Sequence, residues 1–304
     1  MSKRKIRMTQ QNVDYLMSLL LAKIRLSGIP KSAGKNIIAY SGGVDSSVAA
    51  ALVHRMFPEN TIAVTGISPS LSKVQLNQAR DVARVIGVQH VETETSEGEK
   101  DGYIANKGNA CYFCKTTLYD SLQQVHEYAA AEMNNFTFNT RSNRPKLALF
   151  NGTNSEDMLD TSRVGLVAAK EFSVISPLDE ISKDQIRAIA FRLGLPNYNA
   201  AASPCLRSRL AFGIEATEKH LRAVEHAEAK VRQEMGLSME DNMRVRLLPG
   251  QKAALEVDTN RLEEANNVLS ALQLDLEDLG FPTICARPFK SGSVSGYAQI
   301  EKRV

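Results

Sequence analysis

Residues 41–47, with the sequence SGGVDSS, combine three hydroxyl groups, two glycines and one carboxylate. They stand between an apolar run and a stretch with helical spacing, which predicts a strand, a glycine-rich turn and a helix. The paired glycines allow the main chain to take positive φ and to approach a ligand closely. The hydroxyls and the free amides at the start of the helix favour an anion. The segment lacks the lysine of a Walker loop and the spacing of a dinucleotide fingerprint, so it predicts a different kind of nucleotide phosphate site.

Cysteines form the second group of residues that could do chemistry. Cys111 and Cys114 make a C-x-x-C at the start of a helical segment, where amide dipoles favour thiolates. This spacing fits a redox pair, half of a metal site or two core cysteines, and zinc would need four ligands. Cys205 lies in the sequence SPCLRSR, among hydroxyl and guanidinium groups that would activate a thiol. Cys285 lies in an apolar strand pattern and is predicted to be a core residue.

Two further polar patterns are candidates for ligand binding. Residues 151–157, followed by Asp160 and Arg163, come directly after a buried strand, which favours a ligand-facing loop over a plain surface loop. Arg244 and Arg246 alternate along a strand, so both guanidinium groups face one side of it. They could clamp a phosphate or carboxylate, and an exposed basic strand face is the alternative.

Composition narrows the class of protein. The chain has 304 residues, 43% hydrophobic and 23% charged, with a net charge of +3. This length predicts two domains, and no apolar run approaches the length of a membrane span. The mild charge disfavours nucleic acid as the partner. The basic N-terminus lacks the pattern of a secretory signal, and four cysteines are too few for a disulfide scaffold, so we expect a cytoplasmic protein.

Periodicity predicts alternating strands and helices in the first two thirds of the chain, and therefore a parallel α/β sheet. Ligands in such sheets bind beyond the carboxyl ends of the strands, here next to Gly66 and Gly152 as well as to the glycine-rich turn. The predicted strands are 37–40, 61–67, 89–95, 147–151 and 174–176, and the predicted helices are 10–28, 72–86, 111–133 and 183–193.

The pattern changes at about residue 197. A linker is followed by a predicted helix over 217–235, strands over 243–248 and 253–257, a helix over 259–272 and a strand over 283–287. This order predicts a small α+β domain. We therefore expect a nucleotide-binding domain over 1–198 and a second domain, with the linker that carries Cys205, over 199–304. Residues 134–146 are predicted to be an exposed insertion.

Taken in order, the motifs SGGVDSS, CYFCK, NGTNSEDMLD, ISPL, LGLP, SPCLRSR and RVR resemble the LarE family of ATP-dependent sulfur transferases. The glycine-rich segment resembles the PP-loop of the ATP pyrophosphatases. The resemblance runs from about residue 10 to the C-terminus. It implies a HUP-like PP-loop domain of the adenine nucleotide alpha hydrolase type, ATP with Mg²⁺ as cofactors, and homo-oligomers.

The family's reaction supplies sulfur to a nickel-pincer nucleotide. ATP adenylates a carboxylate of a pyridinium biscarboxylic acid mononucleotide, and sulfur replaces AMP to give a thiocarboxylic acid. Cys205 matches the sulfur-bearing cysteine. The implied pyrophosphate site comprises Ser41, Gly42, Gly43, Asp45 and Ser46, with Asp45 helping to hold Mg²⁺. The implied substrate site comprises Asp160, Arg163, Ser208, Arg209, Arg244 and Arg246.

Two branches of this family differ in their source of sulfur. In one, the single active-site cysteine gives up its own sulfur and becomes dehydroalanine. In the other, three cysteines hold a [4Fe-4S] cluster whose open iron binds a sulfide. Cys111, Cys114 and Cys205 together favour the second branch, because a C-x-x-C and one remote thiolate suit a cluster with an open site.

Other functions remain open. A PP-loop enzyme that thiolates transfer RNA is the first alternative, although the net charge is mild and no RNA-binding appendage is evident. A synthetase that makes an amide from ammonia is the second, and it leaves the cysteines unexplained. A nucleotide-binding or cluster-carrying module without catalysis is the third, against which the intact SGGVDSS segment argues.

Overall fold

The computed structural model describes residues 8–133, 146–160 and 163–294. The chain separates into two compact units, each assembled from three stretches of sequence. The first unit contains residues up to Ile67, Lys73–Thr95 and Cys114–Asn199, and the second contains Ser68–Ser72, Ser96–Phe113 and the residues from Ala200 on. The domain division at residues 198 and 199 stays a prediction. The insertion predicted over 134–146 lies almost entirely outside the described residues.

The first unit contains a parallel sheet with the strand order β3-β2-β1-β4 within the described residues. Its strands are β1 (Gly34–Ala39), β2 (Thr61–Ile67), β3 (Gln89–Glu94) and β4 (Lys146–Phe150). The predicted α/β class is confirmed, and the strands lie within a few residues of their predicted bounds. The order places β4 directly beside β1, with β2 on the other side of β1. The direction of strand addition therefore reverses between β1 and β4, where ligands bind in such sheets.

The fifth strand predicted at 174–176 is wrong. Only Ile175 pairs with the sheet, through an isolated bridge to Phe150. Ser173 has a φ of 53° just before it, and the amide of Asp179 bonds the carbonyl of Ser176 in a turn just after it. The chain thus turns on both sides of the bridge, which leaves no room for a longer ladder.

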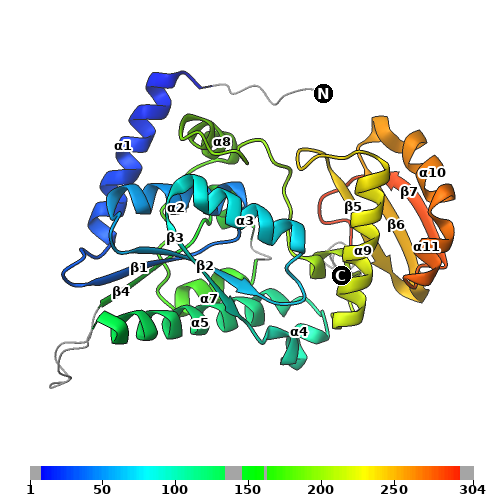
Figure 1. Cartoon of the computed structure of the whole chain (residues 1–304), viewed down its shortest axis with the longest axis horizontal. Coiled ribbons are helices and arrows are strands. Elements are labelled where there is room, and N and C mark those ends of the chain that lie inside the picture. Colours follow the sequence, from blue (N-terminus) through cyan, green and yellow to red (C-terminus); the bar gives the residue numbers. More distant parts are fainter. Residues whose placement is uncertain (1–7, 134–145, 161–162, 295–304) are drawn as a thin grey trace. The chain divides into compact units, whose positions relative to one another are not determined.

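Helices cover both faces of this sheet, with α1, α2, α3 and α8 on one side and α5 and α7 on the other (Figure 1). Thr9 caps α1 by accepting from the amide of Asn12, and Gly28 ends it. The core is a single cluster in which buried residues of α1, α2 and α8 pack with β1. The helices are α1 (Gln10–Ser27), α2 (Val44–Met56), α3 (Lys73–Ile86), α5 (Ala110–Met133), α6 (Ser155–Leu159), α7 (Gly165–Glu171) and α8 (Lys183–Arg192).

The second unit is built on a three-stranded sheet of order β5-β6-β7, as far as the chain is described. Strands β5 (Met243–Leu248) and β6 (Lys252–Val257) are antiparallel, and β7 (Thr283–Pro288) is parallel to β6. Helix α9 (Glu218–Glu234) packs on β5 and α10 (Leu262–Ala271) packs on β7. Periodicity missed α11 (Gln273–Asp278), which follows α10 almost without a break. The short elements are α4 (Asp101–Ile104), η1 (Glu97–Glu99), η2 (Leu206–Arg209), η3 (Pro249–Gln251) and η4 (Thr259–Arg261).

Within the described ranges, every helix is too short or too polar to cross a membrane. The predicted location in the cytoplasm and the predicted homo-oligomer stay predictions.

Candidate functional site

The glycine-rich segment forms the turn between β1 and α2, as predicted. Gly43 is the N-cap of α2, and Ser46 donates to its carbonyl at 3.1 Å. The hydroxyls of Ser41 and Ser46 lie 3.1 Å apart. Gly42 has a φ of 70°, and a Cβ added there would lie 2.5 Å from the Cα of Ala79. Only glycine fits this position, because both the conformation and the close contact exclude a side chain.

Two side chains that the sequence reasoning missed hold this turn in place. Gln78 and Asn197 both donate to the carbonyl of Gly42, at 2.7 and 2.8 Å. Asn197 also donates to the hydroxyl of Ser47 at 3.0 Å. Neither residue belongs to a recognisable motif, since amides distant in sequence give no local signal. These hydrogen bonds to the carbonyl of Gly42 hold the turn in its observed conformation.

The loop after β4 lies directly against this turn. The side-chain amide of Asn154 donates to Asp45 at 3.0 Å. A Cβ on Gly152 would lie 2.6 Å from the main-chain nitrogen of Ser46, so the two loops touch through their backbones. Burial raises the pKa of Asp45 above its usual value; the hydrogen bond from Asn154 opposes this, and the nearby charge of Asp157 adds to it. Two carboxylates near enough for their charges to interact suit a hard divalent cation.

Asp160 and Arg163 are joined to this group through Asp157. The guanidinium of Arg163 lies 2.9 Å from Asp157 and 3.5 Å from Asp160. Asp157 also forms a reciprocal cap with Asn154 at the start of α6. Sequence reasoning placed Asp157 in the loop without assigning it a role. Gly66 was also predicted to belong to the ATP site, but its neighbours come from other segments. A Cβ added there would lie 3.0 Å from the side chains of Leu118 and Thr95.

In the second unit, three buried arginines hold the main chain around Cys205, a stretch that we call the cysteine loop (residues 202–208). Arg244 donates to the carbonyl of Ala202. Arg209 donates to the carbonyls of Pro204 and, at 3.1 Å, Cys205. Arg246 donates to the carbonyl of Ser208 at 2.9 Å. The half-buried Cys205 therefore stands in a loop whose carbonyls are fixed by guanidinium groups from β5 and η2.

Two carboxylates neutralise two of these arginines; Glu256 is fully buried and the side chain of Glu228 is 13% exposed. Arg209 forms a two-point ion pair with Glu228 of α9, at 2.9 and 3.1 Å. Arg246 donates to Glu256 of β6 at 2.8 Å, and Glu256 also pairs with Arg287. Burial alone would raise the pKa of Glu228, but the charge and hydrogen bonds of Arg209 lower it overall. These pairs are well bonded, as buried charges must be.

Arg244 is the exception. Its side chain is buried, with 3% of the residue exposed. Its hydrogen bonds within the described residues both go to main-chain carbonyls, of Met243 and Ala202. Burial lowers the pKa of Arg244 to about 10, and the positive charge of Arg209 adds to the effect. An anion bound at this guanidinium would offset the free-energy cost of burying its positive charge. Arg244 and Arg246 are both buried, so the alternative that they form an exposed basic face of the strand is wrong.

The cysteine loop is also linked to Cys111. Arg207 donates to the sulfur of Cys111 at 3.0 Å and to the side chain of Asn106 at 2.7 Å. Asn106 in turn donates to the carbonyls of Ala211 and Ile214, both at 3.1 Å. The structure therefore brings Cys111 beside the loop that carries Cys205. Cys114 lies three residues further along α5, in the first unit.

Comparisons with known proteins point to one family. The chain is 38% identical over 222 residues to the uncharacterized protein slr1717 of Synechocystis, covering 71% of the chain and 77% of that protein. It is 28% identical over 217 residues to the glutamine-hydrolysing GMP synthase of Heliobacterium modesticaldum, covering 66% of the chain. The chain belongs to the PP-loop family. The PP-loop assignment agrees with the turn between β1 and α2.

One relative aligns along nearly the whole chain. This is the pyridinium-3,5-bisthiocarboxylic acid mononucleotide synthase of Lactiplantibacillus plantarum, 26% identical over 286 residues, which cover 92% of the chain and 96% of that enzyme. By contrast, the chain spans only 40% of the length of the Heliobacterium GMP synthase. No protein-family model matches the chain.

The predicted iron–sulfur cluster needs three thiolates in one place. All four cysteines of this PP-loop protein are described, and none forms a disulfide. Among the described residues, no group of three or more histidine, cysteine, aspartate or glutamate side chains is placed to hold a metal ion. The three-cysteine cluster stays a prediction, with Cys111 and Cys205 in neighbouring segments of the second unit.

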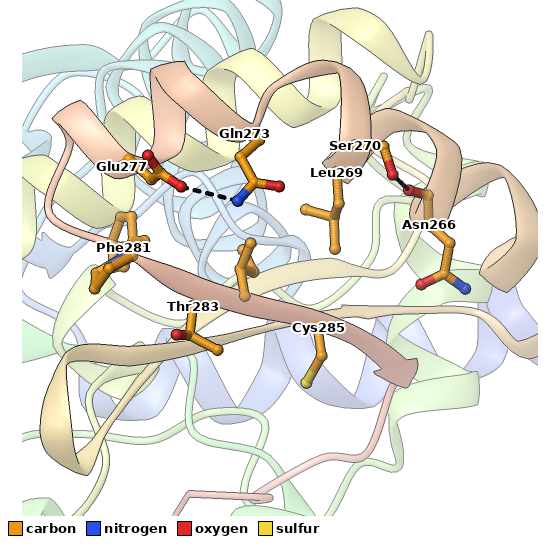
Figure 2. Close-up of a pocket in the computed structure, with 10 residues that line it drawn as sticks. Asn266, Leu269, Ser270, Gln273, Glu277, Phe281, Thr283 and Cys285 are labelled. Carbon is orange, nitrogen blue, oxygen red and sulfur yellow. Dashed lines mark hydrogen bonds between the residues drawn. The ribbon is translucent and has the colours of Figure 1, made fainter.

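The prediction that Cys285 is a core residue is wrong. Among the residues that the structure describes, β7 pairs with β6 alone and is the edge strand, and Cys285 is exposed on it. Cys285 is among the residues around a pocket of about 330 Å³ between β7 and helices α10 and α11 (Figure 2). None of the predicted site residues lines this pocket.

Gly152 offers a test of the contact between the two loops. We expect Gly152→Ala to destabilise the protein by about 1–3 kcal/mol, because the new methyl group meets main-chain atoms that cannot rotate away. Affinity of the PP-loop for ATP should fall with it. Thermal unfolding and ATP titration measure both effects. Gly98→Ala is the control, since nothing lies within 4 Å of a Cβ there; equal melting temperatures for the two variants would refute the contact.

Proposed function

We propose that this protein is an ATP-dependent sulfur transferase that converts a carboxylate of pyridinium-3,5-biscarboxylic acid mononucleotide to a thiocarboxylate. The observation that carries the proposal is the cysteine loop, with Cys205 fixed by three buried arginines and tied through Arg207 to Cys111. A loop that serves only as a linker has no need of such support. The similarity to a bisthiocarboxylic acid mononucleotide synthase, which spans both units, supports the same reaction.

In this proposal the PP-loop binds ATP. The free amides at the start of α2 and the hydroxyls of Ser41 and Ser46 bind the pyrophosphate, with Gly42 and Gly43 allowing its close approach. Asp45 holds Mg²⁺, which supplies positive charge to the phosphates when bound. The raised pKa of Asp45 fits this role, because a cation beside the buried carboxylate would offset the cost of its charge.

The pyridinium nucleotide is assigned to the second unit. Arg244 binds its phosphate, since this buried guanidinium has no carboxylate bonded to it among the described residues. Arg246 and Arg209 hold the cysteine loop, along with Ser208, whose carbonyl accepts from Arg246. Asp160 and Arg163 support the ATP site through Asp157.

The chemistry runs in two stages. The substrate carboxylate attacks the α-phosphorus of ATP, and pyrophosphate leaves, which gives an acyl-adenylate. The sulfur of Cys205 then attacks the carbonyl carbon, and AMP leaves with the bonding electrons, which gives a thioester. Removal of the Cα proton of Cys205 and cleavage of its Cβ–S bond release the thiocarboxylate and leave dehydroalanine.

Pyrophosphate release tests the proposal. With ATP and Mg²⁺, we expect release to depend on the pyridinium dicarboxylate nucleotide and to be accompanied by a thiocarboxylate product. Mass spectrometry of the product and of the tryptic peptide that contains Cys205 follows both outcomes. Pyrophosphate release that does not depend on the pyridinium nucleotide, or that is accompanied by no sulfur-containing product, would refute the proposal.

Anaerobic purification tests the source of the sulfur. Iron and acid-labile sulfide bound to the protein would support the predicted cluster, with Cys111, Cys114 and Cys205 as its ligands. Dehydroalanine at position 205 after turnover, in a protein without iron, would support transfer of the cysteine's own sulfur. The number of turnovers also distinguishes the two sulfur sources, because a cysteine that gives up its own sulfur permits only one product per chain.

An amide-forming PP-loop synthetase is the second candidate, because the chain also resembles GMP synthases. Such an enzyme would use ammonia in place of sulfur. An amide product that forms with ammonium salts, and forms equally well in a Cys205→Ala variant, would favour this function over sulfur transfer.

A further inference from the structure

The peptide that joins Gly42 to Gly43 could take either of two orientations. Glycine adopts positive and negative φ about equally well, so two consecutive glycines allow the plane of the peptide between them to turn over at little cost. In a trans peptide the carbonyl and the amide point in opposite directions. One orientation therefore directs the carbonyl of Gly42 inward and the amide of Gly43 outward, and the other reverses them. The difference matters at a phosphate site, because a phosphate attracts the amide and repels the carbonyl.

The structure has the first of these orientations. Gly42 is buried, whereas Gly43 is exposed. The carbonyl of Gly42 accepts from the side-chain amides of Gln78, at 2.7 Å, and Asn197, at 2.8 Å. The amide of Gly43 therefore points away from both of them. Its hydrogen bond to the hydroxyl of Ser41 is 3.5 Å long, beyond the usual range, which leaves this amide able to donate to a ligand.

A chain of buried hydrogen bonds behind the turn fixes Asn197 as a donor. The hydroxyl of Tyr40 donates to the carbonyl of Ala79 at 3.0 Å. Tyr40 also forms a side-chain hydrogen bond with Ser47, and the proton of that bond must come from Ser47. The hydroxyl of Ser47 then accepts from the amide nitrogen of Asn197 at 3.0 Å. Asn197 thus gives one hydrogen to Ser47 and one to Gly42, and its oxygen could make neither contact.

We propose that Gln78 and Asn197 are positioning residues, which keep the amide of Gly43 directed toward the β- and γ-phosphates of ATP. Each acts through the carbonyl of Gly42. Gln78 belongs to α3 and Asn197 follows α8, so this carbonyl is held from two separate segments of the first unit. Without the two donors, the peptide could turn over and present its carbonyl to the phosphates. This proposal rests on the proposed function, in which the PP-loop binds the pyrophosphate part of ATP.

Binding measurements with the full chain test the two positioning residues. The probes are ATP and inorganic pyrophosphate, each with Mg²⁺, and AMP, which lacks the β- and γ-phosphates; each is titrated by calorimetry. Gln78→Met keeps the length of the side chain and removes its donor without adding a charge. Gln123→Met is the matched control, because Gln123 is exposed on α5 in the same unit.

We expect Gln78→Met to weaken the binding of ATP and of pyrophosphate about threefold to tenfold, as the loss of one hydrogen bond would, and to leave the affinity for AMP almost unchanged. Asn197→Leu should give the same selective loss. If Asn197→Leu does not fold, Gln78→Met decides alone, because Gln78 is only half buried. A purely structural role would weaken all three probes, so an equal loss for AMP, or no loss for any probe, overturns the proposal.

The same titrations separate this proposal from the proposed function. A wild type that binds neither ATP nor pyrophosphate would refute the ATP site itself. Binding is measured without the pyridinium nucleotide and without turnover, so a failure of sulfur transfer would leave these affinities unchanged and would be seen only in the product assay.

Discussion

Replacement of Arg209 by methionine is expected to lower the free energy of unfolding by about 3–5 kcal/mol. Arg209 is 2% exposed and forms a two-point ion pair with Glu228. Its removal leaves the largely buried carboxylate of Glu228 without its cation, and among the described residues the amide of Val245 is the hydrogen-bond donor that remains. The carbonyls of Pro204 and Cys205 lose their donor as well. Denaturant unfolding followed by circular dichroism measures the change.

A second substitution isolates the buried charge. Glu228→Gln in the Arg209→Met background removes the unpaired charge and keeps an acceptor for Val245, so it should restore part of the lost stability. If the two losses simply add, the buried charge is not the cause.

At acid pH, the difference in the free energy of unfolding between Arg209→Met and the wild type should become smaller. Arg209 lowers the pKa of Glu228 in the folded protein, so the wild type has the full benefit of the pair above pH about 4.3 and loses it as the pH falls further. In the variant, burial without the arginine raises the pKa of Glu228. Protonation at low pH therefore removes the cost of its unpaired charge. Unfolding curves between pH 7 and pH 3 follow both trends.

Replacement of Cys205 by alanine is expected to reduce thiocarboxylate formation by at least about a thousandfold, because the sulfur that replaces AMP is lost. Pyrophosphate release should persist, since the PP-loop and Asp45 are unchanged. Mass spectrometry of the product and a pyrophosphate assay on the same samples separate the two stages.

Cys285→Ala is the matched control for this variant. Cys285 lies in the same unit and is also outside any disulfide, but it stands on the edge strand β7 beside the pocket of α10 and α11. It should keep full activity. A Cys205→Ala protein that still makes the thiocarboxylate would place the sulfur elsewhere, and Cys111, which Arg207 contacts, would be the next residue to replace.

Local patterns were enough for much of the fold and for the PP-loop itself. Strand β2 was predicted with its observed bounds, and α1 ends at Gly28 as its glycine suggested. The turn at residues 41–47 is determined by neighbours in sequence, because two glycines, a helix start and the hydroxyls act within a few residues of one another. The single bridge at Ile175 and the exposure of Cys285 were missed, since each depends on which strand lies alongside.

Tertiary structure alone decided the environment of the cysteine loop. The sequence showed Arg244 and Arg246 as candidates for an anion, and the family resemblance placed Arg209 at the substrate site. It could not reveal that Glu228 and Glu256 neutralise Arg209 and Arg246. Those carboxylates come from α9 and β6, and burial and pairing are properties of the assembled unit.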